Sequence, residues 1–181
     1  MAKFKKVEES QITISDLMLP SYSNFGGKIH GGHILNLMDQ VAFACASRHS
    51  GYYCVTASVN TVNFLNPVEV GELLRMKASI NYTGNTSMEV GLRVEAENIQ
   101  TGKTKHCNSS YFTMVAKDKD GGKVKVPGLI LETPDSVRRF ARALKRQEHH
   151  RVRDQLFDDE DFDLSVHVDK LKGYNVSLKL H

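Results

Sequence analysis

The sequence has no long hydrophobic run. No stretch of its 181 residues approaches the roughly 18 consecutive apolar residues of a membrane-spanning helix. Its N-terminus starts basic but lacks the apolar region of a signal peptide, so we expect a cytoplasmic protein. Apolar residues make up 40% and charged residues 25%, which is ordinary for a globular chain, and the length suits one domain with an appendage.

Cysteine and net charge are also scarce. The three cysteines, Cys45, Cys54 and Cys107, are an odd number without close spacing, which argues against a disulfide framework and a zinc site. Their apolar surroundings favour buried free thiols over a catalytic cysteine. The eight histidines include no H-x-x-x-H pair with a nearby carboxylate, so we expect no metal. A net charge of +3 argues against general nucleic-acid binding but leaves room for a local basic patch facing an anion.

Residues 32–47 have the pattern of a buried helix. Ile34, Met38, Val41 and Cys45 form one helical stripe, and further apolar residues widen it beyond that of a surface helix. Asp39 lies at the border of this apolar surface, beside a narrow line of polar positions.

After this helix the period of the pattern changes to two. Strands are predicted over residues 11–17, 53–65, 73–82, 87–97 and 105–116, and short turn sequences between the later strands predict hairpins. The phase slips near Thr61, which predicts a β-bulge there. A single sheet needs its apolar face covered, so we expect an α+β fold in which an antiparallel sheet wraps around one central buried helix.

The chain changes character after Pro127. Residues 136–152 read as an amphipathic helix, with basic side chains around an apolar face made of Val137, Phe140, Ala141 and Leu144. An acidic run follows, and alternation over 164–180 predicts a small terminal hairpin. We therefore divide the chain into a domain at 1–128 and a C-terminal helical extension at 129–181.

A loop with four glycines, residues 24–32, leads into the predicted central helix. A helix N-terminus offers unpaired N–H groups and a partial positive charge, which suit an anion or a developing oxyanion. The spacing fits neither a phosphate P-loop nor a dinucleotide fingerprint. The alternative is a flexible connection that lets the helix tuck under the sheet.

Asp39 is the other candidate for chemistry. A carboxylate two turns into a nearly all-apolar helix costs several kcal/mol to bury unpaired, so it should be hydrogen-bonded or face a cavity. The functional interpretation is a general base or nucleophile in a sheltered site. The alternative is a polar residue at a solvated edge of the helix.

The order of these features resembles a known family, the hotdog-fold acyl-CoA thioesterases of the cytosolic and bacterial type. Residues 31–39 (GGHILNLMD) resemble the family's central helix, and 54–59 (CVTASV) resemble its next strand. Residues 64–72 (FLNPVEVGE) are similar to its F-x-x-P-V-x-V-G segment, and 83–88 (TGNTSM) to a hairpin loop. The resemblance covers about residues 8–128 and does not extend into 129–181.

This resemblance implies hydrolysis of acyl-CoA to free fatty acid and CoA. It implies Asp39 as a water-activating base or nucleophile, Asn24 as a residue that positions water or substrate, and the Gly31 and Gly32 amides as oxyanion donors. Thr56 would complete the pocket from the neighbouring subunit. Family members join two sheets edge to edge in a dimer with the active sites at the seam, and often assemble further into trimers of dimers.

The resemblance also implies a path for CoA, which enters only as part of substrate and product, so no separate cofactor is expected. The residues assigned to this path are His30, Gly31, Gly84, Asn85, Thr86 and Ser87, with Lys123 and Lys125 as candidates to meet the CoA phosphates. Lys28 departs from the family pattern, and its role is open. We expect neither a nucleic-acid partner nor a membrane span.

Two other functions remain open. One is a hotdog hydratase or dehydratase acting on acyl thioesters, for which His30 would be the catalytic histidine. The other is a non-catalytic acyl-CoA or nucleotide sensor, with the basic C-terminal helix as its output surface. The preferred acyl chain length does not follow from the sequence.

Overall fold

The computed structural model describes residues 3–156, 168, 170–171 and 174–179. Its elements, in chain order, are β1 (Phe4–Lys6), β2 (Ile12–Leu17), α1 (Gly31–Ser50), β3 (Tyr53–Val59), β4 (Glu72–Thr83), β5 (Ser87–Asn98), β6 (Thr104–Lys117), β7 (Gly128–Ile130) and α2 (Pro134–Leu156). Two single-turn 3-10 helices, η1 (Val7–Ser10) and η2 (Pro20–Tyr22), flank β2. The predicted α+β organisation is confirmed.

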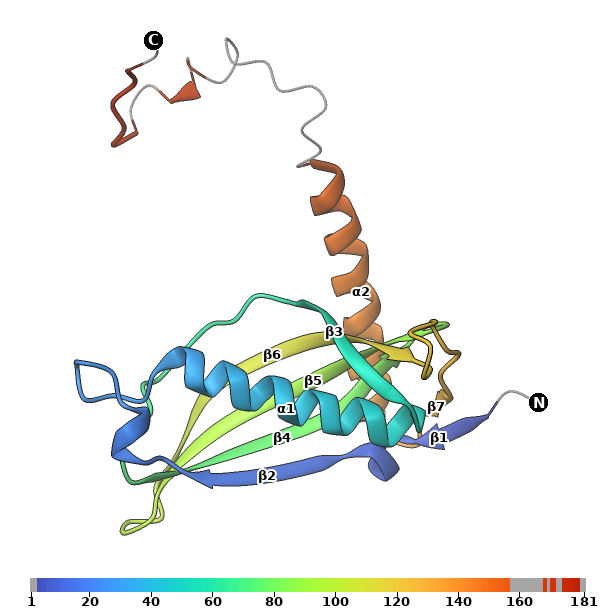
Figure 1. Ribbon diagram of the computed structural model, residues 1–181, viewed down its shortest axis with the longest axis horizontal. Helices are drawn as coiled ribbons and strands as arrows, with labels where there is room; N and C mark the ends of the chain where they lie inside the picture. The colour runs from blue at the N-terminus through green and yellow to red at the C-terminus, as the bar shows by residue number, and fades with distance from the viewer. Residues whose placement is uncertain (1–2, 157–167, 169, 172–173, 180–181) are drawn as a thin grey trace. The chain divides into compact units, whose positions relative to one another are not determined.

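A five-stranded antiparallel sheet with the strand order β2-β4-β5-β6-β3 curves around α1 (Figure 1). The β4–β5 and β5–β6 pairs are the hairpins predicted from the turn sequences. The short strands β1 and β7 pair in parallel, apart from this sheet. β3 is an edge strand, so within the described chain one side of its backbone has no strand partner.

The core forms where α1 meets the concave face of the sheet. All four residues of the predicted helical stripe are at most 3% exposed. They pack against alternating side chains of the central strands, which include Leu74, Met76, Ile80, Val90, Val94, Phe112 and Met114. Burying each large apolar side chain contributes about 1.5–3 kcal/mol, so the helix and the sheet stabilise each other.

The prediction for β3 was wrong at its far end. The strand stops at Val59 rather than at residue 65, and the register shift lies between Thr56 and Ser58 rather than near Thr61. Beyond Val59 the chain stays beside β6 but makes only scattered bonds to it. Asn60 N–H donates to the Tyr111 carbonyl and Leu65 N–H to the Cys107 carbonyl, both at 2.9 Å, and the Nδ2 groups of Asn66 and Asn108 donate to the His106 and Asn63 carbonyls. A period of two in the sequence does not distinguish these contacts from a strand.

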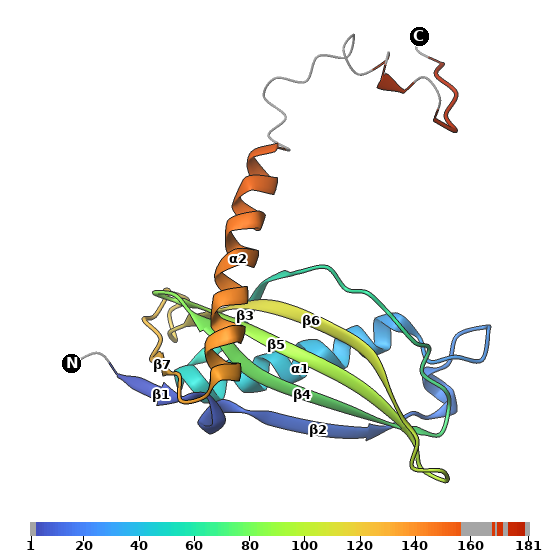
Figure 2. The ribbon, with the colours of Figure 1, turned by 180° about the vertical axis from the view of Figure 1, so that it is seen from behind.

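The helix predicted in the C-terminal extension is present as α2. The chain divides into two units, Met1–Leu144 and Lys145–His181, so the first turns of α2 belong to the unit that contains the sheet. There α2 lies over the sheet face opposite α1 (Figure 2): Phe140 contacts Tyr82 with ring centroids 5.2 Å apart, and Arg139 donates to the Ser79 hydroxyl at 3.0 Å. The domain boundary at 128/129 stays a prediction.

The apolar face predicted for this helix is only partly correct. Ala143 is fully buried and Phe140 half-buried, whereas Val137 and Leu144 remain exposed. The face that packs differs from the predicted one because the partners on the sheet are Tyr82, which contacts the Phe140 ring, and Ser79, which accepts from the Arg139 guanidinium. The predicted terminal hairpin falls partly outside the described residues, and 174–179 form no strand. None of the described helices is both long and apolar enough to cross a membrane.

His49, near the C-terminal end of α1, ties the helix to two other segments. Its Nε2 lies 3.0 Å from the Pro127 carbonyl, which can only accept, so Nε2 carries the proton. Burial, with a smaller effect from the Lys5 charge, holds the pKa of His49 below its usual value, which favours the neutral ring. Nδ1 then accepts from the Ser10 hydroxyl at 2.7 Å.

This arrangement predicts a loss of stability in mild acid. A depressed histidine pKa means that the unfolded chain takes up a proton first, so the free energy of unfolding falls as pH drops below about 6.5, the unperturbed histidine value. We expect urea unfolding curves measured at several pH values to show this fall. His49→Gln should reduce the slope of the free energy of unfolding against pH. His106→Gln is the control for removing one half-buried histidine. An unchanged slope in His49→Gln would contradict the assignment.

Candidate active site

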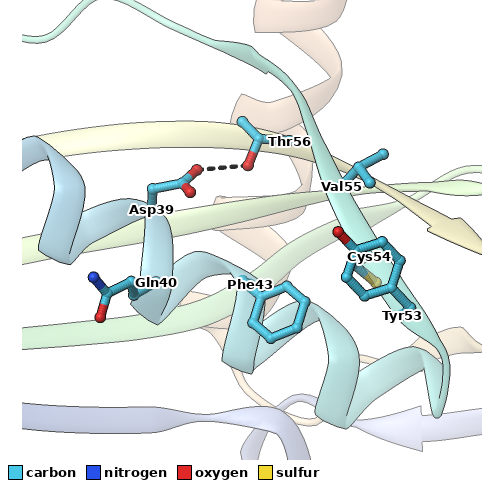
Figure 3. A pocket seen from close by; sticks show the side chains of 7 residues that line it. All are labelled: Asp39, Gln40, Phe43, Tyr53, Cys54, Val55 and Thr56. Carbon is cyan, nitrogen blue, oxygen red and sulfur yellow. Dashed lines mark hydrogen bonds between the residues drawn. The ribbon is translucent and has the colours of Figure 1, made fainter.

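Asp39 lies in the middle of α1 and is half-buried. Its Oδ1 accepts a hydrogen bond of 2.6 Å from the Thr56 hydroxyl on β3 (Figure 3). The two residues meet because α1 ends at Ser50 and is capped by Gly51, whose left-handed backbone (φ 77°) turns the chain so that β3 runs back along the helix. The prediction that Asp39 is hydrogen-bonded or faces a cavity is confirmed on both counts, as the next feature shows.

A cavity of about 490 Å³ opens beside Asp39, between α1 and the edge strand β3 (Figure 3). Its lining residues are Asp39, Gln40, Phe43, Tyr53, Cys54, Val55 and Thr56. Phe43 and Tyr53 form an edge-to-face pair with ring centroids 5.7 Å apart. No lining residue is cationic, and polar and apolar side chains share the lining, so the cavity suits an uncharged group beside one carboxylate.

The sequence analysis missed most of this lining. Phe43 lies four residues after Asp39, so helical spacing alone places it on the same face, one turn away. Tyr53 gives a weaker signal, because an aromatic residue at the start of a strand is common. The expectation that Thr56 comes from a neighbouring subunit was wrong for its contact with Asp39, because the two residues meet within one chain.

The cysteines do not supply a nucleophile. All three are buried, as predicted, and burial raises the pKa of the Cys45 thiol to about 12. Burial also raises the pKa of Cys107. Cys54 lines the cavity but is only 1% exposed, and it contacts the Ser50 hydroxyl.

Asn24 shapes the glycine-rich loop. Its side-chain oxygen accepts from the N–H groups of Gly26 and Lys28 at 2.9 and 3.2 Å, and its own N–H donates to the Lys28 carbonyl at 2.7 Å. Residues 23–29 thus form a small closed loop that projects at the N-terminal end of α1 (Figure 1). Asn24 is exposed and does not line the Asp39 cavity of its own chain.

Lys28, whose role was open, anchors this loop. Its Nζ lies 2.6–2.7 Å from both carboxylate oxygens of Glu69. The Glu69 N–H in turn donates to the carboxylate of Glu72, which also pairs with Lys105 at 2.9 Å. These linked ion pairs and this hydrogen bond hold the loop against the start of β4.

Gly31 and Gly32 occupy the first turn of α1, as predicted to within one residue. The first helical hydrogen bonds come from His33 and Ile34, which both donate to the His30 carbonyl. In the described structure the amides of Gly31 and Gly32 therefore have no partner, and His30 caps the helix without a side-chain hydrogen bond. At 1.5 Å of rise per residue, these amides lie roughly 10–12 Å from Asp39 along the same helix.

The residues predicted along the CoA path form a second group. The Gly84–Ser87 turn joins β4 to β5, and the segment with Lys123 and Lys125 lies against it: Val126 N–H donates to the Asn85 carbonyl at 3.0 Å. Both lysines are exposed, because Val124 and Val126 between and after them turn inward. Neither the turn nor the lysines line the Asp39 cavity.

Comparison with known proteins identifies the family. The family model described as the thioesterase superfamily matches residues 26–103. Protein VdlD of Helicobacter pylori is 44% identical over 141 residues, which cover 78% of this chain and 80% of that protein. The human cytosolic acyl coenzyme A thioester hydrolase is 35% identical over 74% of this chain but only 36% of its own length. The chain belongs to the thioesterase superfamily, with relatives of the acyl-CoA hydrolase type.

Solved structures agree on the fold. An apo-hexameric acyl-CoA thioesterase superposes with a TM-score of 0.81 at 34% identity, covering 83% of this chain and 97% of the other. The acyl-CoA hydrolase of Staphylococcus aureus, solved with butyryl coenzyme A, coenzyme A and coenzyme A disulfide, gives 0.79 at 27% identity, covering 93% and 98%. The sheet wrapped around α1 is therefore the hotdog fold that the resemblance implied.

Proposed function

We propose that the chain hydrolyses acyl-CoA thioesters to a free acid and CoA, with Asp39 as general base or nucleophile. The observation that carries this proposal is the position of Asp39, a half-buried carboxylate at the wall of a 490 Å³ cavity whose hydrogen-bond partner is a neutral hydroxyl. Thr56 occupies Oδ1 and fixes the carboxylate, which leaves Oδ2 for a water molecule or a carbonyl carbon. A thioester is an activated carbonyl, so a carboxylate and an oxyanion site suffice to hydrolyse it.

The oxyanion site requires a second copy of the chain. Oxyanion donors act at about 2.7–3.1 Å, whereas the Gly31 and Gly32 amides lie roughly 10–12 Å from Asp39 in one chain. The same carbonyl cannot reach both groups unless the amides come from another subunit. Asn24 leads to the same conclusion, because its loop projects away from its own cavity.

The edge strand β3 provides a way to join two copies. Its outer side, which has no strand partner among the described residues, can pair with β3 of a second copy about a two-fold axis. The two α1 helices then run antiparallel, and the first turn of α1 in each copy comes to lie against the middle of α1 in the other. Asp39 and Thr56 of one copy would thus meet Asn24, Gly31 and Gly32 of the other.

Relatives support the residue roles and the assembly. The Staphylococcus aureus acyl-CoA hydrolase was solved as variants in which an aspartate, an asparagine or a threonine is replaced by alanine. These three residues follow one another in the same order and at the same spacings as Asn24, Asp39 and Thr56 here. Two solved relatives are described as hexameric, so we propose a dimer that assembles further into a trimer of dimers.

CoA would lie outside the Asp39 cavity. Its phosphates need cations or free amides, and the lining of the cavity supplies neither. We propose that the Gly84–Ser87 turn, together with Lys123 and Lys125 beside it, meets the pantetheine and the phosphates, and that His30 lies near this path. Release of a free thiol from acyl-CoA separates hydrolysis from hydration of an acyl thioester and from binding alone.

Replacing Asp39 tests the proposed function. Asp39→Asn should lower kcat for acyl-CoA hydrolysis by at least about a hundredfold, the scale of a lost general base, while the fold remains intact. Steady-state release of CoA thiol measures the effect. The matched control is Asp16→Asn, a half-buried aspartate on β2 at the opposite edge of the sheet, which should keep wild-type activity. Near wild-type turnover by Asp39→Asn would refute the mechanism.

Thr56 should act through Asp39. Thr56→Val removes the hydroxyl at nearly the same volume, and a hydrogen bond to a charged group is worth about 1.5–3 kcal/mol, so kcat should fall about tenfold or more. Thr56→Ser keeps the donor and should retain most of the activity. If valine and serine behave alike, the hydrogen bond does not matter for catalysis.

A further inference from the structure

Phe25 is the most exposed large apolar residue of the described chain, with a relative exposure of 114%. Single exposed apolar residues are common on protein surfaces, so exposure alone indicates no function. The position of Phe25 is what matters, because it follows Asn24 in the projecting loop and none of the described residues of its own chain buries its ring.

The loop holds Phe25 in a defined place. The Asn24 side chain closes the loop, and Gly27 supplies the positive φ of 73° that the tight return needs. At its base, Ile29 N–H donates to the Val68 carbonyl at 2.9 Å and His30 N–H to the Tyr22 carbonyl at 2.8 Å. A side chain presented this way loses little conformational freedom when it packs against a partner.

A matching apolar surface forms part of the wall of the Asp39 cavity. Phe43 and Tyr53 are 38% and 62% exposed, although they contact each other edge to face (Figure 3). Both belong to the half of the α1–β3 unit that follows Asp39 along the helix. In the antiparallel arrangement of two copies, the loop in front of α1 reaches this half of the partner helix.

We propose that Phe25 of the partner subunit packs against Phe43 and Tyr53 and forms the wall of the slot that receives the acyl chain. This inference rests on the proposed function and on the β3–β3 dimer. The slot beside Asp39 then has an aromatic ring on three sides and no cation, which suits a hydrocarbon chain. A buried phenylalanine covers about 150–250 Å², enough to exclude water from this end of the cavity.

The wall should set the length of the acyl chain. A fixed ring across the slot stops long chains, so Phe25→Ala should raise the ratio of kcat/KM for lauroyl-CoA to that for butyryl-CoA by about tenfold, the low end of what one methylene is worth in an apolar pocket. Phe25→Leu should give a smaller rise in the same direction. Ile99→Ala removes another exposed apolar side chain, on the β5–β6 turn, and should keep the wild-type ratio.

Tryptophan fluorescence tests the contact itself, because the natural chain contains no tryptophan. Phe25→Trp introduces a single reporter, whose emission should be blue-shifted in the assembled protein and should change when butyryl-CoA is added to a Phe25→Trp/Asp39→Asn variant that turns over slowly. Ile99→Trp should emit as a fully exposed indole in the same buffer.

The outcomes separate this inference from the proposed function. If Asp39→Asn loses hydrolysis but both Phe25 variants keep the wild-type chain-length ratio, the proposed function stands and the role of Phe25 is overturned. If kcat/KM changes equally for all chain lengths and free CoA inhibits more weakly, the ring lies against pantetheine, which would also overturn the proposed role of Phe25. If Phe25→Ala disrupts the assembly, the chain-length ratio measured for Phe25→Leu decides. An exposed-type spectrum for Phe25→Trp would rule out the contact.

Discussion

The burial of α1 in the curved sheet is the constraint on which the rest of the structure depends. One antiparallel sheet has one apolar face to cover, and this helix covers it with side chains that are almost fully buried. A charged residue in the middle of such a helix must lie at its border and must be paired, and Asp39 satisfies both conditions through Thr56. The same packing leaves β3 at the edge of the sheet, next to the cavity. The edge strand of the sheet and the candidate site are therefore adjacent.

The sequence predicted the central helix, the approximate positions of the strands along the chain and the wrapped sheet because these depend on local periodicity. The expected simple meander was wrong, because β3 pairs with β6 at the far edge and β4 pairs with β2 instead. An apolar period of 3.6 over residues 32–47 and a period of two afterwards leave few other arrangements. Asp39 could be found for the same reason, since a carboxylate contrasts sharply with its apolar neighbours. The turn at Gly84–Ser87 and the glycine-rich loop were recognisable from their turn-forming residues.

What the sequence did not predict depends on contacts between distant segments. Beyond β3 the chain keeps only scattered backbone bonds to β6, supplemented by side-chain bonds from Asn66 and Asn108, and a period of two cannot show this mixture. Lys28 is recognisable as an anchor only once the fold brings Glu69 beside it. The packed face of α2 depends on Tyr82 and Ser79, which lie on β4 and so cannot be found from the pattern of the helix sequence.

The central claim is that one active site needs two chains, with Asp39 from one and Asn24 from the other. Subunit complementation tests it most directly. Asp39→Ala and Asn24→Ala chains, each nearly inactive alone, are unfolded together and refolded as a mixture. A shared site predicts that random pairing restores roughly a quarter of the wild-type sites, because each mixed dimer has one site with both residues intact. If the mixture is no more active than its separate components although mixed dimers form, the site belongs to a single chain and the account is wrong.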